Sequence, residues 1–165
     1  MENVTKITKR VTATVTRPAN TTAYAALDVL ADKTADASVL TFADAVPVEN
    51  DAFEIVEANL RIDHATVIAS DFRLHLYSSE PTAIVDNAAY NLPAADRSKY
   101  LGYIDWADPI DLGDTQWAQA QPTLKGRVVR SKSTNQSLYA ILQTIDGFTP
   151  ASAVVHTIEL VIALV

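Results

Sequence analysis

The residues best suited to binding a transition metal or moving a proton are three histidines, and they lie far apart. His64, His75 and His156 lie on or next to three separate predicted strands. A helical zinc site places two histidines four residues apart, and no pair here has that spacing. His75 lies on the polar face of its strand, so we expect it to be exposed. The histidines therefore predict surface or cross-strand contacts, and the sequence indicates no metal and no cofactor.

Acidic residues form a second group with possible chemistry. Between Asp105 and Asp114 an aspartate recurs at every third position. Carboxylate oxygens suit calcium, but the ligands of an EF-hand loop begin at every second position. Aspartate also starts turns, and a proline and a glycine in this segment favour a solvated loop. A loop is the favoured interpretation, and a calcium site is the alternative.

Aromatic residues gather around this acidic segment. Trp106 and Trp117 lie within and just after it, and Tyr90, Tyr100 and Tyr103 precede it. Aromatic faces bind apolar ligand surfaces, so the group is a candidate platform for stacking a sugar. Aromatic residues also anchor cores and interfaces, and both interpretations stay open.

The motifs of nucleophilic catalysis are missing from the sequence. The chain contains no cysteine and no Gly-x-Ser-x-Gly segment, and its 4 glycines are too scattered for a phosphate-binding loop. Aspartate and glutamate are abundant, but abundance alone defines no catalytic pair. The sequence therefore predicts that the protein is not an enzyme and has no catalytic residues. A cryptic hydrolase is the remaining alternative.

Charge is distributed unevenly along the chain. The formal net charge is −7, but residues 1–17 carry +3 and residues 125–165 carry +2, which leaves −12 on residues 18–124. An acidic body repels nucleic acid and anionic membranes, so we expect neither as a partner. The basic residues near the N-terminus are instead candidate contacts to an acidic protein partner: Lys6, Lys9, Arg10 and Arg17.

The spacing of apolar residues predicts the elements that position these groups. A chain of 165 residues is the size of one domain. Short alternating or apolar segments, separated by Pro, Asn, Asp and Gly, predict an all-β, single-domain β-sandwich that is jelly-roll-like. We divide the chain into an N-terminal arm or edge strand over 1–17 and a β-sandwich domain over 18–165. The expected strands are 10–16, 37–43, 52–62, 66–69, 71–78, 100–105, 125–131, 136–145 and 153–164.

Other local features of the sequence refine this picture. Short helical turns are predicted over 22–31 and 93–99. The parity of apolar residues changes inside 52–62, which predicts a bulge near Val56 or Glu57. No segment has the apolar run of a signal peptide or a spanning helix, so we expect a soluble protein made in the cytosol.

Two predicted strands bear on assembly. In 71–78 apolar and polar residues alternate, which is typical of a half-buried strand. The loop after it, from about Ser78 to Asn91, is a candidate contact surface. The strand over 153–164 is apolar on both faces, so we expect it to be covered inside the fold or by another copy.

Three segments resemble a known group of proteins. They are residues 17–24, reading RPANTTAY, residues 72–104, reading FRLHLYSSEPTAIVDNAAYNLPAADRSKYLGYI, and residues 148–160, reading FTPASAVVHTIEL. With them the chain resembles, over nearly its whole length, small structural proteins of tailed bacteriophages.

The resemblance implies a β-sandwich protein of the virion. Such a protein is made in the host cytoplasm and lies on the capsid surface, where it decorates or stabilises the shell by binding the major capsid protein. Copies are expected to associate as a homo-oligomer, with a trimer favoured. The alternative function is a carbohydrate-binding module on a tail or fibre, with Trp106 and Trp117 at its site.

Overall fold

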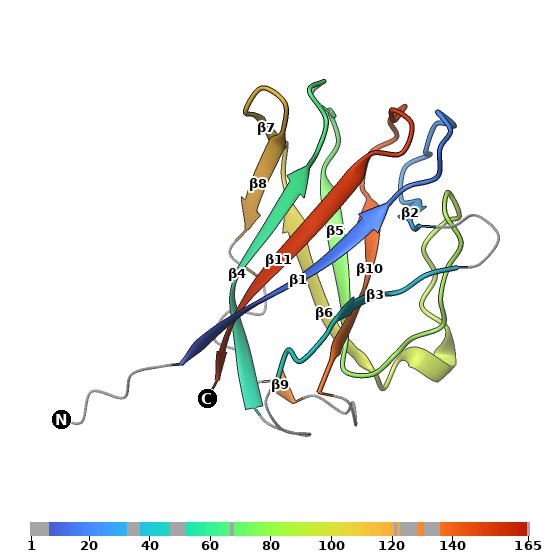
Figure 1. Cartoon of the computed structure of the whole chain (residues 1–165). Helices are drawn as coiled ribbons and strands as arrows, with labels where there is room; N and C mark the ends of the chain where they lie inside the picture. Colours follow the sequence, from blue (N-terminus) through green and yellow to red (C-terminus); the bar gives the residue numbers. More distant parts are fainter. Residues whose placement is uncertain are drawn as a thin grey trace.

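Two antiparallel β-sheets pack face to face in this protein, as a computed structural model shows (Figure 1). The structure describes residues 7–32, 37–46, 52–66, 68–120, 122, 129–130 and 136–164. Strands supply nearly all of the regular structure in these ranges, beside one 3-10 turn. The prediction of an all-β sandwich is confirmed.

The first sheet lies in front in Figure 1, where β1 and β11 cross the molecule side by side. Its strand order is β1-β11-β4-β8-β7, and β9 pairs with the far end of β4. The bounds of these strands are Thr8–Thr16 for β1, Ala52–Ile62 for β4, Ile110–Asp111 for β7, Gln116–Ala120 for β8, Val129–Arg130 for β9 and Val155–Leu164 for β11.

The second sheet lies behind the first. Its order is β2-β10-β5-β6, and β3 pairs with β10 beyond the end of β2. In a jelly roll, two four-stranded antiparallel sheets face each other. The strand orders β1-β11-β4-β8 and β2-β10-β5-β6 of the two facing sheets have this arrangement. The bounds are Val29–Leu30 for β2, Leu40–Phe42 for β3, Phe72–Tyr77 for β5, Tyr100–Trp106 for β6 and Leu138–Thr144 for β10, with the 3-10 turn η1 at Ala94–Asp96.

The core fills the space between the sheets. Period-two alternation sends one side of each strand inward, so Val11, Ala13 and Val15 of β1 are buried while the threonines between them are exposed. Burying a large apolar side chain stabilises the fold by about 1.5–3 kcal/mol. The largest fully buried apolar side chains of the described residues are Trp106, Phe42, Phe53, Phe72, Ile55, Leu60, Ile62, Leu74, Leu76 and Ile104.

The predicted bulge in β4 is confirmed. Val161 of β11 pairs with Glu57, and the next residue, Ile162, pairs with Ile55. Val56 is therefore the extra residue, and it restores the inward direction of the apolar side chains on both sides of it.

The strand β11 occupies the middle of the first sheet, between β1 and β4. Its inner face joins the core through Ile158, Leu160 and Ile162. On the other face Val161 and Ala163 are also buried within the single chain, at 8% and 0% exposure. The fold itself therefore covers Val161 and Ala163 on the outer face of β11, whereas Thr157 and Glu159 on that face are half-buried.

The helix predicted over 22–31 is wrong. Tyr24 forms a β-bridge with Phe148, and its ring stacks on that of Phe148 with centroids 5.2 Å apart. Asp28 then accepts a hydrogen bond from the backbone N–H of Ala25, which closes a turn, and β2 follows. Apolar residues recur at every third position in 22–31 because they pack at separate points along a loop. Tertiary contacts therefore override the weak helical pattern.

Other local predictions have mixed outcomes. A helical turn is present at η1 after Pro93, as predicted within 93–99. The strand predicted over 66–69 is absent from its described residues, where the N–H of Ile68 donates to the side chain of Gln116 instead. β7 and β8 were not predicted, and most of 125–131 lies outside the described residues. No helix in the described part of the chain is long and apolar enough to cross a membrane.

Candidate functional site

The outer face of the second sheet is covered by the loop that runs from Ser78 to Lys99. We call this surface the covered face. Tyr90 donates its backbone N–H to Leu27 O at 3.0 Å, and Val29 donates to Ala88 O at 2.9 Å, so backbone bonds tie the loop to β2 and its flank. The side chains beneath it form a second apolar cluster, made of Val29, Ala31, Tyr77, Tyr139 and Ile141.

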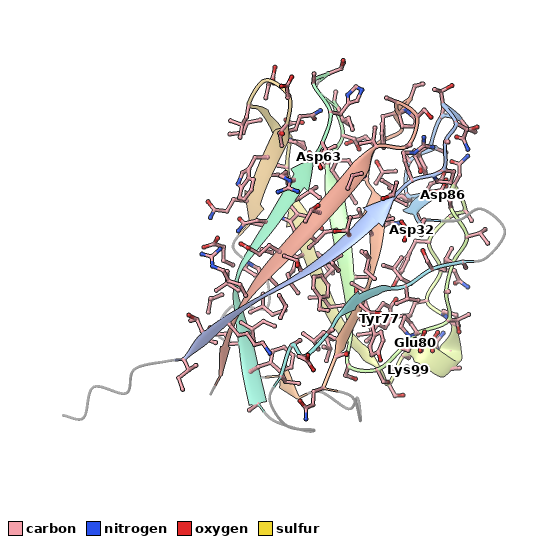
Figure 2. All side chains as sticks on the ribbon, in the orientation of Figure 1. Asp32, Asp63, Tyr77, Glu80, Asp86 and Lys99 are labelled. Carbon is pink, nitrogen blue, oxygen red and sulfur yellow. The ribbon has the colours of Figure 1, made fainter. Side chains whose placement is uncertain are left out.

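Charged side chains hold this loop where its two ends meet and at Asp86 in its middle. Figure 2 shows Tyr77, Glu80 and Lys99 near η1, with Asp86 farther along the same side of the molecule. Lys99 Nζ donates to Glu80 O at 2.8 Å and to Asp96 Oδ1 at 2.7 Å, and this keeps the pKa of Asp96 below its ordinary value. Asp86 Oδ1 accepts hydrogen bonds from the Tyr24 hydroxyl and from the N–H of Ala31.

His75 lies inside the covered face. Its side chain is 4% exposed, so the prediction of an exposed histidine is wrong. The ring stacks on Tyr90 with centroids 3.7 Å apart and an angle of 7° between the planes. Its Nε2 lies 2.9 Å from Gln143 Oε1, and its Nδ1 lies 3.1 Å from the Tyr100 hydroxyl. Burial lowers the pKa of His75 from 6.5 to about 4, so the ring is neutral and structural at neutral pH.

The outer face of the first sheet has a different character, and we call it the open face. Most of its side chains are polar and exposed or half-buried. The strand registers arrange them in two cross-strand rows, because directly opposed residues share a face. One row is Thr14, Thr157, Arg61, Trp117 and Ile110, and the next is Thr12, Glu159, Asn59 and Gln119.

A depression of about 170 Å³ lies on the open face. Asn59, at its floor, is only 3% exposed. The Asn59 Nδ2 donates to Glu57 Oε1 at 2.7 Å and to Glu159 Oε1 at 3.2 Å, whereas its carbonyl oxygen Oδ1 has no partner among the described residues. The six residues that line the depression are Thr12, Asn59, Arg61, Trp117, Thr157 and Glu159.

Opposite charges alternate around this depression. Arg10 Nη1 donates to Glu159 Oε1 at 2.5 Å, and Arg61 Nε donates to Asp63 Oδ1 at 3.0 Å. Hydrogen bonds from the side chains of Asn59 and Gln119 hold the pKa of Glu57 below its ordinary value. Glu57 is therefore ionised at neutral pH, and the face offers both donors and acceptors.

The two tryptophans have separate roles. Trp106 is 1% exposed, and its indole N–H donates to Ala58 O at 3.0 Å inside the core. A sugar platform that includes Trp106 is therefore wrong. Trp117 is half-buried on the open face, beside the exposed side chain of Ile110. Of the predicted aromatic group, Trp117 alone lines the depression.

The aspartates of 105–114 are spread over a strand and a hairpin rather than around one point. Asp105 accepts two hydrogen bonds from the guanidinium of Arg73, at 2.7 and 2.9 Å. Asp111 accepts the N–H of Gly113 in the turn between β7 and β8. In the described ranges no group of three or more His, Cys, Asp or Glu side chains is placed to hold a metal ion, which leaves the calcium alternative without support.

The three histidines are not brought together. His64 accepts the N–H of Thr66 in a loop. His156 is 0% exposed in the core, and neither of its ring nitrogens has a hydrogen-bond partner among the described residues. Burial lowers the pKa of His156 to about 4, so this ring too is neutral at neutral pH.

The predicted partner contacts of the N-terminal segment differ in exposure. Arg17 is 1% exposed, and its guanidinium donates to backbone oxygens of Asn20 and Ala151 and to the Tyr24 hydroxyl. It fastens the loop after β1 and is not available to a partner. Lys9 donates to Asp44 O, and the side chain of Arg10 is 64% exposed. Lys6 lies outside the described residues.

The outer edge of β1 is the side that faces away from β11. In an antiparallel pair, successive residues turn their N–H groups to alternate sides. Arg17 donates its N–H to Val154 O on the β11 side, whereas Thr16 donates to Asp32 Oδ1 on the other side. Arg10, Thr12 and Thr14 share the parity of Thr16, so their N–H and C=O groups point away from β11. No strand of the described part of the chain pairs with this edge.

Sequence reasoning missed most of the open face. Asn59, Arg61, Thr157 and Glu159 stand at polar positions between buried apolar residues, a signal that places them on the outer face of their strands. The sequence does not show that β4 and β11, which are almost a hundred residues apart, pair in the register that joins these side chains.

Comparisons with known proteins show distant similarities of fold. No protein-family model matches the sequence, and no curated protein matches it. Among solved structures, a cyanophage Pam1 capsid asymmetric unit gives a TM-score of 0.39 at 11% identity, covering 100% of this chain and 90% of that chain. A carbohydrate-binding module specific for non-crystalline cellulose gives 0.38 at 10% identity, with 88% and 71% coverage.

A third similar structure is a virus-like particle of the Macrobrachium rosenbergii nodavirus. Its TM-score is 0.35 at 12% identity, and the match covers 99% of this chain and 95% of that chain. These TM-scores lie below 0.5, so they assign no function to the chain.

Proposed function

We propose that this chain is a non-enzymatic structural protein of a phage virion that decorates the capsid by binding the major capsid protein. The observation that carries the proposal is the outer edge of β1, with which no strand of the described residues pairs. An exposed edge strand is a template on which an extended segment of another protein can add a strand. The resemblance of residues 17–24, 72–104 and 148–160 to structural proteins of tailed phages supports the same role.

The side chains around this edge suit an acidic partner. Ile7 is 68% exposed and adds apolar area at the start of β1. Arg10 is largely exposed, Lys9 lies next to it, and Lys6 precedes them in the sequence. Basic residues at the rim of an interface speed association with an acidic surface and fix its orientation.

The two sheets give this edge a rigid support. β1 pairs with β11 over nine residues, from Thr8 opposite Ala163 to Thr16 opposite Val155. Its inner side chains are part of the core. A strand added to β1 would therefore be connected through β11 and the core to the whole sandwich. The resemblance to structural proteins of tailed phages separately implies that copies of the chain associate on the shell, with a trimer favoured.

Binding to capsid shells tests the role of the edge. Thr14→Pro removes one outward N–H, at a position where an edge strand tolerates proline. Thr14→Ala keeps that N–H and removes only the side chain. We expect the proline variant to bind purified shells that lack this protein about tenfold more weakly than the wild type, and the alanine variant to bind normally. Co-sedimentation measures both affinities.

The fold of each variant is checked by circular dichroism and thermal unfolding. A folded proline variant that binds shells as tightly as the wild type would remove the β1 edge from the interface. Failure of the wild-type chain to bind shells at all would refute the decoration role.

A further inference from the structure

We propose that the open face carries a saccharide-binding site, centred on Trp117 and Asn59. This site adjoins the outer edge of β1 at Thr12, which lines the depression, but it does not depend on capsid binding. Its ligand class is a neutral oligosaccharide, which offers hydroxyl groups and the apolar faces of its rings.

The unpaired carbonyl of Asn59 points to a ligand that donates hydrogen bonds. Because Nδ2 donates to both Glu57 and Glu159, the orientation of the amide is fixed, and Oδ1 is left as the atom without a partner. Buried acceptors are nearly always satisfied in folded proteins, so an unpaired one needs an explanation. This oxygen is itself buried, so a ligand hydroxyl group would supply the missing hydrogen bond once the side chains that line the depression move apart.

The aromatic side of the depression supplies an apolar surface. Trp117 pairs across the sheet with Ile110, which is 60% exposed, and with Arg61 on its other side. An indole ring beside an exposed aliphatic side chain makes a flat apolar strip at the edge of a polar area. The face of a sugar ring, which carries C–H groups, fits such a strip.

The remaining lining residues match the dual character of a hydroxyl group, which both donates and accepts. Arg61 has donors, Glu159 has acceptors, and the threonines have both. The guanidinium of Arg61 is positioned by Asp63 at 3.0 Å and by the Thr157 hydroxyl at 3.4 Å. A site with its polar groups held in place loses less entropy when a ligand binds.

Charge on the open face argues against an anionic ligand. The carboxylates of Glu57 and Glu159 both contact the amide of Asn59, and a phosphate at this point would meet two negative charges. A neutral ring with several hydroxyl groups meets no such repulsion. The arginines of this face, Arg10 and Arg61, are already paired with Glu159 and Asp63. The contacts at Asn59 therefore favour a neutral saccharide there over a phosphate or a nucleotide.

The two tryptophans make a direct test possible. The chain has 2 tryptophans, and Trp106 is buried in the core, so Trp106→Phe leaves Trp117 as the single fluorescent reporter. The probes are an array of cello-, malto-, chito- and rhamno-oligosaccharides, followed by titration of the bound compounds against the fluorescence of Trp117. Wild-type protein is titrated in parallel by calorimetry, because Trp106→Phe alters the core.

We expect at least one oligosaccharide to bind, and Trp117→Ala and Asn59→Leu each to weaken that binding about tenfold or more. Trp117→Phe, which keeps a ring, should retain part of the affinity. The matched control is Tyr103→Ala, which removes an aromatic side chain that is 38% exposed on the second sheet and should leave binding unchanged. Thermal unfolding confirms that each variant is folded.

Two results would overturn the saccharide site. One is that none of the oligosaccharides binds, or that binding is unchanged in folded Trp117→Ala and Asn59→Leu. The other is that Trp117→Ala weakens binding to capsid shells while no oligosaccharide binds, which would make the open face a protein contact. Neither result depends on whether the β1 edge binds the shell.

Discussion

The outer faces of the two sheets are opposites in almost every respect. On the covered face the loop from Ser78 to Lys99 buries a cluster of tyrosines around a neutral histidine. On the open face charged and hydroxylated side chains meet solvent directly, around a depression lined by Asn59, whose buried amide carbonyl has no partner among the described residues. A β-sandwich can leave both of its outer faces polar and exposed. In this chain the loop from Ser78 to Lys99 instead buries a second apolar cluster on the outer face of the second sheet.

We interpret the covered face as a source of stability and propose the open face as a surface for contact. The second sheet, enclosed between the core and the loop, has a central strand β10 that is buried at every residue. The first sheet ends in the unpaired edge of β1 and presents rows of polar side chains beside it. Substitutions should therefore affect folding on the covered face and binding on the open face.

The largest expected effect is the loss of a tyrosine from the covered face. Tyr77 is 1% exposed, and its hydroxyl lies 2.7 Å from that of Tyr90. We expect Tyr77→Ala to lower the free energy of unfolding by about 3–5 kcal/mol, because a large ring is removed from a packed site. Trp117→Ala on the open face should cost less than about 1 kcal/mol. Urea unfolding of the two variants measures the contrast, and equal losses would refute it.

A smaller effect is expected from acid. The folded pKa of His75, about 4, lies below its ordinary value of 6.5, so the unfolded chain binds the proton more readily than the folded chain. The stability that neutral His75 contributes is complete above about pH 6.5 and is lost as the pH falls toward 4. Between pH 7 and pH 4 the wild type should lose about 3 kcal/mol more than His75→Gln. His156 titrates in both proteins and cancels from the difference.

Urea unfolding at several pH values measures this difference. Parallel stability curves for the wild type and His75→Gln would mean that His75 is hydrated in solution and that the covered face opens easily.

The smallest effect is expected on the open face. Arg10 and Glu159 form an ion pair in which the Arg10 side chain is 64% exposed. We expect Arg10→Ala to change the free energy of unfolding by no more than about 1 kcal/mol, and the change should shrink in high salt. The same variant should weaken shell binding at low salt. Thermal unfolding and co-sedimentation across a salt series compare the effects on stability and on shell binding. A large loss of stability would mean that Arg10 contributes mainly to folding and not to partner contact.

Period-two alternation made most of the sandwich predictable from the sequence. The strands 52–62, 71–78, 100–105, 136–145 and 153–164 agree with β4, β5, β6, β10 and β11 to within about two residues. A change of parity predicts a bulge near Val56 or Glu57, and the strand register places it at Val56. Short elements were missed or misread where a few residues carry too little pattern. β2, for example, has only two residues and follows a turn whose apolar side chains imitate a helix.

The covered face and the open face could not be predicted in the same way, because both depend on contacts distant in the chain. His75 stands at a polar position of β5, and only the return of the loop over the sheet buries it beside Gln143. Asn59 and Glu159 are a hundred residues apart, and the register of β4 against β11 alone brings them together. A sequence shows which face a side chain takes, but not what covers that face.

A reconstruction of the decorated particle tests the central claim most directly, since it shows which surface meets the shell. The account predicts that the outer edge of β1, from Thr8 to Thr14, lies against the major capsid protein, with the loop from Ser78 to Lys99 turned away from that contact. A reconstruction in which this loop makes the contact and the β1 edge faces solvent would contradict it.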